Sequence, residues 1–392
     1  MSWTTAKLGE VTTIMSGTTP DSANPAFWNG HHVWVTPTDL GKLDSALIAT
    51  SSRLISEEGR SSCNLPMIPC GAVVMSSRAP IGHLAIAGCD LHTNQGCKSF
   101  VCGDSLDSEF LFFTIKHRML DIQAMGSGST FAEVSKSALD AFEIEYPSIE
   151  LQRLIAARLK AQLAEVETAR QAVQAQLRDS RLLRSRMLKD FFAELDAAPR
   201  KKLGDYAPTT SGTTPSRGNK HYWEPAEIAW VKTGEVAFAP ITSTEEAISK
   251  AALAECSLSL LPTKTVLIAM YGQGKTRGQS AILEIPATTN QACFAVLPND
   301  TWEPDFLFLW LKASYQDLRD LSEDRGGNQA NLNGALLNAL DVPAPGKPEQ
   351  QAMVARINAA MTEVDALENS SKTALADINQ LPQRILASAF EI

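Results

Sequence analysis

The sequence lacks the features that mark membrane, secreted and metal-binding proteins. Its longest apolar stretches, such as residues 306–311, are far too short to cross a bilayer, and its start has no basic-then-apolar signal pattern. The seven cysteines form no C-x-x-C pair, so we expect buried free thiols in a reducing compartment. His31 and His32 are adjacent but have no Cys or carboxylate at ligand spacing nearby. We therefore expect a cytoplasmic protein without membrane contact or bound metal.

Patterns that indicate catalysis are also missing. There is no G-x-S-x-G or H-E-x-x-H motif, and no lysine has Asp or Glu two residues before it, as a metal-dependent nuclease would need. Residues 272–276 resemble a phosphate-binding loop, but Ala269 stands where that pattern requires glycine. The formal net charge of −9 argues against indiscriminate nucleic-acid binding. Any contact with DNA should therefore use small basic loops.

What the sequence does contain is an internal duplication. Ser16-Gly17-Thr18-Thr19-Pro20 returns as Ser211-Gly212-Thr213-Thr214-Pro215, and Trp28 returns as Trp223, both 195 residues later. Asn94-Gln95 likewise returns as Asn290-Gln291. Because binding residues should differ between two recognition units while core residues should repeat, we expect the repeated tryptophans to be core aromatics.

Two long helices are predicted beside these copies. Leu159, Val166 and Val173 recur every seven residues, which predicts one helix from residue 151 to about 195. The closing segment repeats this pattern, until Pro382 is expected to break or kink its last turns. Each helix alone leaves an apolar stripe in water, so we expect the two to pack together in antiparallel fashion. By the repeat, residues 163–169 of the first helix match residues 361–367 of the second.

Each copy reads as a mixed α/β unit. In the first copy, strands are expected at residues 8–15, 32–36, 72–75, 84–87 and 99–102, and a helix at residues 110–122. The predicted fold class is therefore mixed α/β, with two similar globular domains separated by a pair of long antiparallel coiled-coil helices and related by a pseudo-two-fold repeat. The expected segments are residues 1–148, 149–196, 197–348 and 349–392, alternating between globular domain and helix.

The loops differ between the copies although the frameworks repeat. Divergent loops on a shared scaffold are what two recognition modules for different ligands need. An arrangement with two-fold symmetry suits double-stranded DNA, and Arg or Lys in such loops can bond guanine edges or phosphate. The candidate DNA-binding residues are Thr36, Arg78, His83 and Lys98 in the first copy and Lys232, Thr233, Gln273, Lys275 and Arg277 in the second.

Taken together, the duplicated motifs and the helix endings at Met187-Leu188 and Ile385-Leu386 resemble the specificity subunits of Type I restriction-modification systems. The resemblance covers essentially the whole chain. It implies two target-recognition domains that each read one half of a split DNA sequence, at residues 1–148 and 197–348. It also implies that the helices dock modification subunits, through the seam residues Leu159, Val166, Val173, Leu177, Ile357, Val364, Leu375 and Ile378.

The same resemblance implies the partners and cofactors. Two modification (methyltransferase) subunits would bring S-adenosylmethionine, and restriction/translocase subunits would bring ATP and Mg, so the chain itself is expected to hold no cofactor, no metal and no catalytic residue. One alternative is a fused or orphan methyltransferase or nuclease specificity protein, against which the missing cofactor motif speaks. The other is a coiled-coil scaffold that binds no DNA, which would have no reason to vary its loops.

Overall fold

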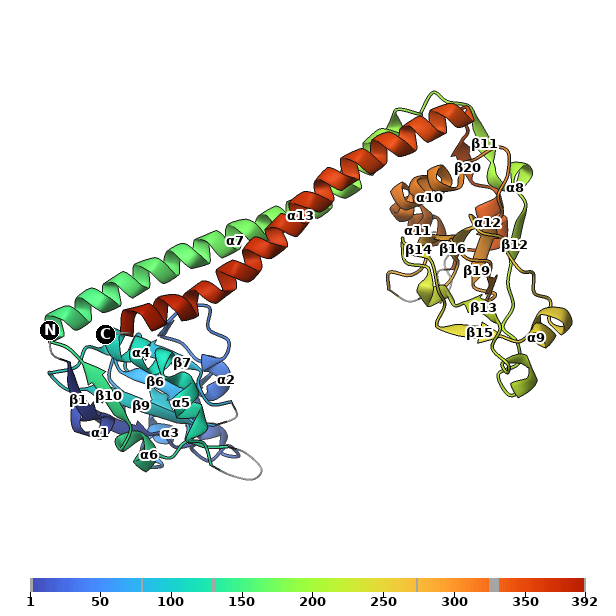
Figure 1. Cartoon of the computed structure of the whole chain (residues 1–392). Coiled ribbons are helices and arrows are strands. Elements are labelled where there is room, and N and C mark those ends of the chain that lie inside the picture. The colour runs from blue at the N-terminus through green and yellow to red at the C-terminus, as the bar shows by residue number, and fades with distance from the viewer. Residues whose placement is uncertain (1–2, 79, 128–131, 273, 324–330, 391–392) are drawn as a thin grey trace. The chain divides into compact units, whose positions relative to one another are not determined.

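The computed structural model describes residues 3–78, 80–127, 132–272, 274–323 and 331–390. Its contacts divide the chain into two units: unit 1 comprises Met1–Val173 and Ala374–Ile392, and unit 2 comprises Gln174–Thr373. Each unit contains one copy of the repeat and part of each long helix (Figure 1). Within the described ranges, no helix is long and apolar enough to cross a membrane.

Unit 1 contains ten strands and six short helices before the first long helix, in the part of the chain that is described. Its strands are β1 (Thr4–Lys7), β2 (Thr12–Ser16), β3 (Trp28–Val35), β4 (Leu47–Ile48), β5 (Arg53–Ile55), β6 (Val73–Ser76), β7 (Leu84–Ala87), β8 (His92–Thr93), β9 (Cys97–Cys102) and β10 (Glu143–Tyr146). Its helices are α1 (Leu8–Val11), α2 (Pro37–Leu40), α3 (Glu57–Ser61), α4 (Ser108–His117), α5 (Met119–Ala124) and α6 (Lys136–Asp140), with a 3-10 turn, η1 (Pro25–Phe27).

These strands form two sheets and a separate pair. The five-stranded sheet has the order β2-β9-β6-β7-β4, the three-stranded sheet has the order β5-β3-β8, and β1 pairs with β10. Side chains alternate across the central strand β6: Val73 and Met75 join the core shared with α4 and α5, whereas Val74 joins the core on the opposite face. Both faces of the sheet are therefore covered, which explains the continuous apolar run in this strand.

Unit 2 repeats this topology. Its strands are β11 (Arg200–Lys202), β12 (Thr209–Ser211), β13 (Ile228–Val231), β14 (Pro240–Ile241), β15 (Glu246–Ile248), β16 (Val266–Ala269), β17 (Ser280–Leu283), β18 (Thr288–Thr289), β19 (Cys293–Val296) and β20 (Asp341–Pro343). Its short helices are α8 (Leu203–Tyr206), η2 (Lys220–Tyr222), η3 (Thr233–Glu235), α9 (Lys250–Glu255), α10 (Pro304–Ala313), α11 (Tyr315–Glu323) and α12 (Gly334–Asn338). The sheet orders β12-β19-β16-β17-β14 and β15-β13-β18 correspond strand for strand to those of unit 1.

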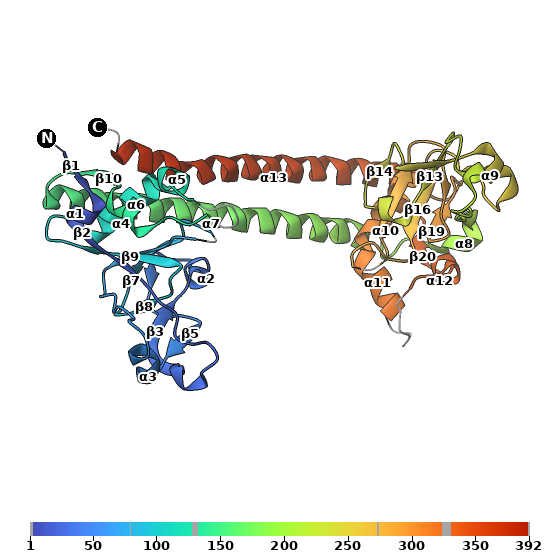
Figure 2. The ribbon, with the colours of Figure 1, turned by 90° about the horizontal axis from the view of Figure 1, so that it is seen from below.

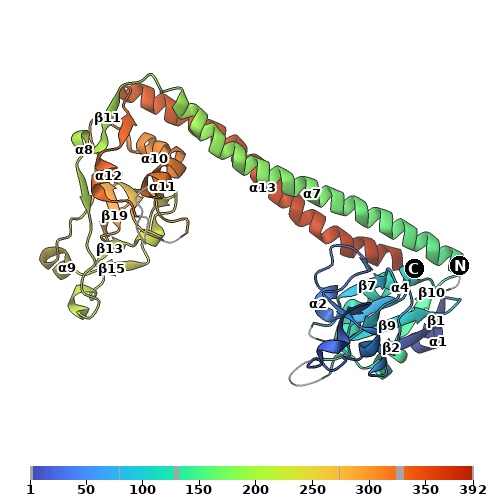
Figure 3. The same ribbon diagram turned by 180° about the vertical axis from the view of Figure 1, so that it is seen from behind.

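In each unit the three-stranded sheet lies at the end away from the long helices. Figure 2 shows β3, β5 and α3 in this position in unit 1, and Figure 3 shows β13, β15 and α9 in the equivalent position in unit 2. The five-stranded sheet therefore lies between the helices and the three-stranded sheet.

The two long helices are α7 (Ile149–Ala193) and α13 (Lys347–Phe390). In unit 1, Leu159 and Leu163 of α7 share a core with Ile385 and Leu386 near the end of α13. In unit 2, Leu188 near the end of α7 shares a core with residues near the start of α13, among them Met353 and Ile357. The beginning of each helix thus packs on the end of the other, and the predicted antiparallel pairing is confirmed.

Most predicted elements of unit 1 are confirmed, with three differences. Residues 8–11 form the helical turn α1 ahead of the strand instead of the start of the strand itself. The predicted helix at residues 110–122 is two helices, because Arg118 between them departs from helical geometry at φ −88°, ψ 16°. Of the expected break or kink at Pro382, the break is wrong, because α13 continues through this proline to Phe390.

Candidate nucleic-acid interface

The repeated Ser-Gly-Thr-Thr-Pro loop is bound to the same partners in both units. In unit 1, the backbone N–H of Thr18 donates to the Thr93 carbonyl (3.0 Å), and the Trp34 indole N–H donates to the Thr18 carbonyl (3.1 Å). In unit 2, the equivalent bonds run from Thr213 to Thr289 (3.0 Å) and from Trp230 to Thr213 (3.1 Å). The buried tryptophans therefore have a structural role, because they hold the loop in place.

A second repeated contact joins this loop to the Asn-Gln turn. The Thr19 hydroxyl donates to Oε1 of Gln95, and the Thr214 hydroxyl donates to Oε1 of Gln291, each at 2.5 Å. Both glutamines are exposed, and within the described ranges no hydrogen bond engages their side-chain amide N–H groups. Such amides can bond base edges or phosphate, so Gln95 and Gln291 are candidate contacts common to both units. In the sequence they looked like framework residues because they repeat.

In unit 2, the hairpin loop between β16 and β17 presents one exposed lysine. The Tyr315 hydroxyl donates to the Lys275 carbonyl (2.6 Å), and the Arg319 guanidinium donates to the Gly274 carbonyl (2.7 Å). Both donors belong to α11, which thereby supports the loop, while the Lys275 side chain is exposed. The loop leads into strand β17 and not into a helix, so it lacks the helix that directly follows a phosphate-binding loop.

The unit 1 loop between β6 and β7 is arranged around a carboxylate. Glu133 lies 3.7 Å from Arg78 and 3.4 Å from Lys98, measured between charged atoms. The Arg78 side chain is partly exposed, but Lys98 is only 5% exposed as a residue. The structure brings these two predicted residues together, and Glu133, which the sequence analysis did not single out, offsets part of their charge.

Two of the predicted DNA-binding residues are buried, and their role in binding stays a prediction. Lys98 and Arg277 have 5% and 7% of their surface exposed, so both lie beneath the surface of their units instead of on it. A double substitution of Lys275 and Arg277 would therefore disturb the folded loop as well as its surface. Lys275 is exposed and Arg78 is partly exposed, whereas Gln273 lies outside the described residues.

The other predicted DNA-binding residues contact side chains or backbone within their own unit. The Thr36 hydroxyl bonds Asp39 (2.6 Å) and caps α2, and the Thr233 hydroxyl donates to Oδ1 of Asn290 (2.9 Å). Lys232 forms ion pairs with Glu245 (2.6 Å) and Glu246 (3.0 Å), and the hydrogen bonds that it donates to these carboxylates raise its pKa. His83 is half-buried against Gly41. These contacts position the loops, and any role in DNA binding stays a prediction.

An arginine lies over the tryptophan pair in both units. The Arg53 guanidinium is 3.4 Å from the centre of the Trp28 ring, and that of Arg217 is 4.1 Å from the centre of Trp223. Arg53 comes from β5, where it pairs opposite Trp34, but the matching position of β15 is Glu246, which binds Arg217 from a different loop. A guanidinium therefore lies over the tryptophan in both units, but it comes from different sequence positions. Aligning the two repeats could not reveal this shared cation–π contact.

The predicted docking residues lie mainly between the two long helices. Leu159, Ile357 and Val364 are buried, and Val166, Val173, Leu177, Leu375 and Ile378 are half-buried. These residues therefore contribute to the packing of α7 and α13, and any role in docking a partner stays a prediction. The exposed leucines of the helices lie off the seam: Leu154 (65% exposed), Leu182 (57%), Leu183, Leu367 and Leu381.

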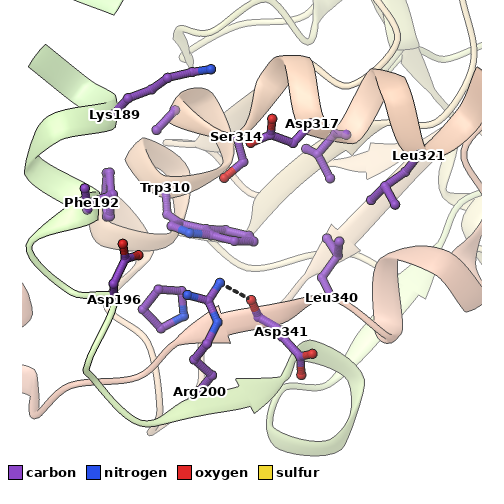
Figure 4. Close-up of a pocket in the computed structure, with 14 residues that line it drawn as sticks. Lys189, Phe192, Asp196, Arg200, Trp310, Ser314, Asp317, Leu321, Leu340 and Asp341 are labelled. Carbon is purple, nitrogen blue, oxygen red and sulfur yellow. Dashed lines mark hydrogen bonds between the residues drawn. The ribbon is translucent and has the colours of Figure 1, made fainter. Parts of the chain in front are cut away.

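Unit 2 also has a hollow of about 370 Å³ beside the end of α7. Figure 4 shows Phe192 of α7, Trp310 of α10 and Leu321 of α11 around it, with Lys189 at its edge. Arg200 donates to the Asp341 carbonyl (2.8 Å) on another side of the hollow. Its lining thus combines apolar side chains with charges of both signs.

Comparisons with known proteins agree with this architecture. The model of the "Type I restriction modification DNA specificity domain" matches residues 1–176 and again residues 199–376. The chain is 29% identical over 289 residues to the MjaIX specificity subunit of Methanocaldococcus jannaschii, and 26% identical over 185 residues to the EcoR124I/EcoR124II specificity subunit of Escherichia coli. These matches cover 69% and 47% of this chain, and 66% and 45% of those relatives.

Solved structures show the same fold. A chain of a type I R-M system, studied for its complex assembly and conformational transition, superposes with a TM-score of 0.74 at 18% identity, covering 99% of this chain and 97% of that one. The HsdS subunit from Thermoanaerobacter tengcongensis superposes with a TM-score of 0.65 at 18% identity, covering 99% and 96%.

Proposed function

The chain belongs to the Type I restriction-modification DNA specificity family, and we propose that it directs a modification complex to a two-part target in double-stranded DNA. The observation that carries this proposal is that units 1 and 2 share one framework but differ in the loops attached to it. The same bonds hold the Ser-Gly-Thr-Thr-Pro loop in both units, while the neighbouring hairpins present Arg78 in one and Lys275 in the other. Each unit would then read its own half of the target.

We assign the recognition domains to residues 1–148 and 197–348 and the helices to residues 149–196 and 349–392. The bounds of α7 and α13 support this division. The chain would contribute recognition and no catalysis. Two modification subunits would supply S-adenosylmethionine and methylate adenine, restriction subunits would supply ATP and Mg, and the complex would act in the cytoplasm.

Recognition by the second unit is tested with Lys275. Cells that carry this chain with its modification subunits should contain methylated adenines in a two-part sequence. Because Lys275 is exposed and only its backbone carbonyl is held, Lys275→Ala should remove a phosphate or base contact without unfolding the loop. We expect about tenfold less methylation at limiting enzyme. If the lost contact is to phosphate, the plot of log DNA affinity against log salt concentration should also become less steep, by about one in slope.

Lys202→Ala is the matched control, because Lys202 is an exposed lysine of the same unit on β11 and should leave methylation unchanged. Normal methylation by Lys275→Ala at limiting enzyme would rule out the loop as a contact. Methylated sites without a two-part sequence would argue against the proposed function itself.

Docking is tested on the exposed leucines of α7. Large exposed apolar side chains on a helix mark a surface that a partner covers, and Leu182 and Leu183 are adjacent. Replacing both with serine should weaken assembly with the modification subunits by tenfold or more, at about 1 kcal/mol or more per side chain. Size-exclusion chromatography of the mixed subunits measures this. The control is Leu260→Ser, which changes a similarly exposed leucine away from the helices and should assemble normally. If the variant with serine at both 182 and 183 also assembles like the wild type, this surface of α7 is not the docking site.

A further inference from the structure

The three-stranded sheet of unit 1 gathers two histidines and a carboxylate. Candidate ligand atoms of His31, His32 and Glu57 all lie within 4.8 Å of one another, and in the described ranges this is the one such group of three or more residues that the structure contains. His32 Nε2 lies 2.7 Å from a Glu57 carboxylate oxygen. No metal was expected here because no carboxylate lies near these histidines in the sequence. Glu57 is 25 residues from His32, but β3 and the start of α3 bring the two together.

A β-bulge explains why two adjacent histidines share one side of the strand. Neighbouring residues of a regular strand point to opposite faces. In β3, however, both Trp28 and His32 pair with Ile55, so residues 29–31 form a bulge, and Asn29 has a positive φ of 61°. Bulges redirect side chains in this way. The rings of His31 and His32 consequently lie close together, with their centres 4.2 Å apart and their planes tilted by 39°.

The surroundings of the cluster suit a metal site. The Arg60 guanidinium binds one Glu57 oxygen and leaves the other toward His32, and hydrogen bonds of this kind orient ligating carboxylates. The His92 ring packs edge-on against His32, with centres 5.8 Å apart. Two imidazoles and a carboxylate, partly exposed so that water can complete a tetrahedron, are a ligand set that Zn²⁺ accepts.

Unit 2 provides an internal comparison. By strand register, His32 corresponds to Ile228, so His31 corresponds to Glu227 and Glu57 to Lys250. There, Lys250 and Glu227 form an ion pair (2.8 Å) that ties the strand to the helix. A plain ion pair is therefore sufficient to connect these elements, and unit 1 carries three metal-ligating groups where unit 2 carries a salt bridge.

We propose that His31, His32 and Glu57 form a binding site for a divalent transition-metal ion, with Zn²⁺ as the expected occupant. The ion would join β3 to the start of α3. Zinc–ligand bonds of about 2.1 Å in a tetrahedron place ligand atoms about 3.4 Å apart. Small side-chain rotations bring the three groups to that spacing from their present separations within 4.8 Å.

His31→Ala separates this proposal from a purely structural role. A structural ion pair needs only His32 and Glu57, and among the described residues no hydrogen bond to the His31 ring is seen. With the full-length chain first stripped of metal by a chelator, titration calorimetry should show one Zn²⁺ bound per chain. His31→Ala should weaken this binding tenfold or more while leaving the unfolding temperature of the metal-free chain unchanged.

Glu227→Ala, at the matching position of unit 2, is the control and should bind Zn²⁺ like the wild type. Glu57→Gln keeps the shape of the side chain and serves as a second variant if His31→Ala is poorly soluble. It is also expected to weaken Zn²⁺ binding tenfold or more. A wild-type chain that binds no Zn²⁺ stoichiometrically overturns the proposal. Equal binding by wild type, His31→Ala and Glu57→Gln also overturns it, because the ion would then be held by other groups such as the cysteines.

Discussion

Removing seven residues from each long helix at facing positions should shorten the unspecified gap in the DNA target by about three base pairs. Seven helical residues span about 10 Å, and base pairs are spaced about 3.4 Å apart. A whole heptad also keeps the apolar seam in phase. Both half-sequences should stay unchanged, because neither recognition loop is altered. Sequencing of the methylated sites measures the gap directly.

The contacts between the helices decide which residues to remove. Arg184 forms ion pairs with Asp365 and Glu368, and Arg356 pairs with Glu194. For residues that face each other across the antiparallel helices, the two residue numbers therefore sum to about 550. Leu163 accordingly lies in the same core as Leu386. Residues 167–173 of α7 therefore face residues 376–382 of α13, and deleting these two segments keeps the packed residues at both ends.

The segments that are equivalent in the repeat do not face each other, so removing them together would not keep the helices in register. Residues 163–169 and 361–367 are equivalent in the repeat, but Leu163 packs in the core of unit 1 and Met361 packs in the core of unit 2. Their joint removal would shift each helix against an unshortened partner. Deleting residues 167–173 alone is the control and should abolish methylation. If the facing deletion folds and still methylates sites with the original gap, the helices do not set the distance between the half-sites.

Gly212→Ala should abolish recognition of the second half-site. A β-carbon at Gly212 would lie 1.8 Å from the Thr289 carbonyl oxygen, so the loop must move away from the strand it is bound to. This movement breaks the bond from Thr213 N–H to Thr289 and strains the Trp230 contact. We expect a loss of about 2–4 kcal/mol in the stability of unit 2 and no detectable methylation.

Gly218→Ala is the matched control, because a β-carbon there meets nothing within 4 Å. It should change stability by less than about 0.5 kcal/mol and leave methylation normal. Gly17→Ala should act on the first half-site as Gly212→Ala acts on the second, since its β-carbon would lie 2.0 Å from the Thr93 carbonyl. Thermal unfolding and methylation assays measure both effects. Normal methylation by Gly212→Ala would show that the close approach of loop and strand is not required.

The two units differ in how their candidate cations are held. In unit 1, Glu133 lies near both Arg78 and Lys98, whereas in unit 2 the exposed Lys275 forms no ion pair within the described residues. A phosphate approaching unit 1 must compete with a carboxylate, and one approaching unit 2 does not. Substitution of Lys275 is therefore the more direct test of recognition.

The sequence alone determined the duplication, the two long helices and several strands of each unit. These features follow from local patterns: seven-residue spacing predicts the helix seam, and the apolar run at residues 72–75 predicts a buried strand, observed at Val73–Ser76. The burial of Trp28 also followed, since the core of a duplicated fold must repeat, whereas its repeat Trp223 is only half-buried. Such predictions need no knowledge of which distant segments meet.

Contacts between distant segments were decided only by the tertiary structure. Burial of Lys98 and Arg277 depends on neighbours outside their own hairpins, and a β-bulge turns His31 and His32 toward Glu57. The arginine over the tryptophan pair comes from different sequence positions in the two units, so aligning the repeats conceals it. Local spacing determines which element a segment forms, but the partners of a side chain depend on how the elements pack.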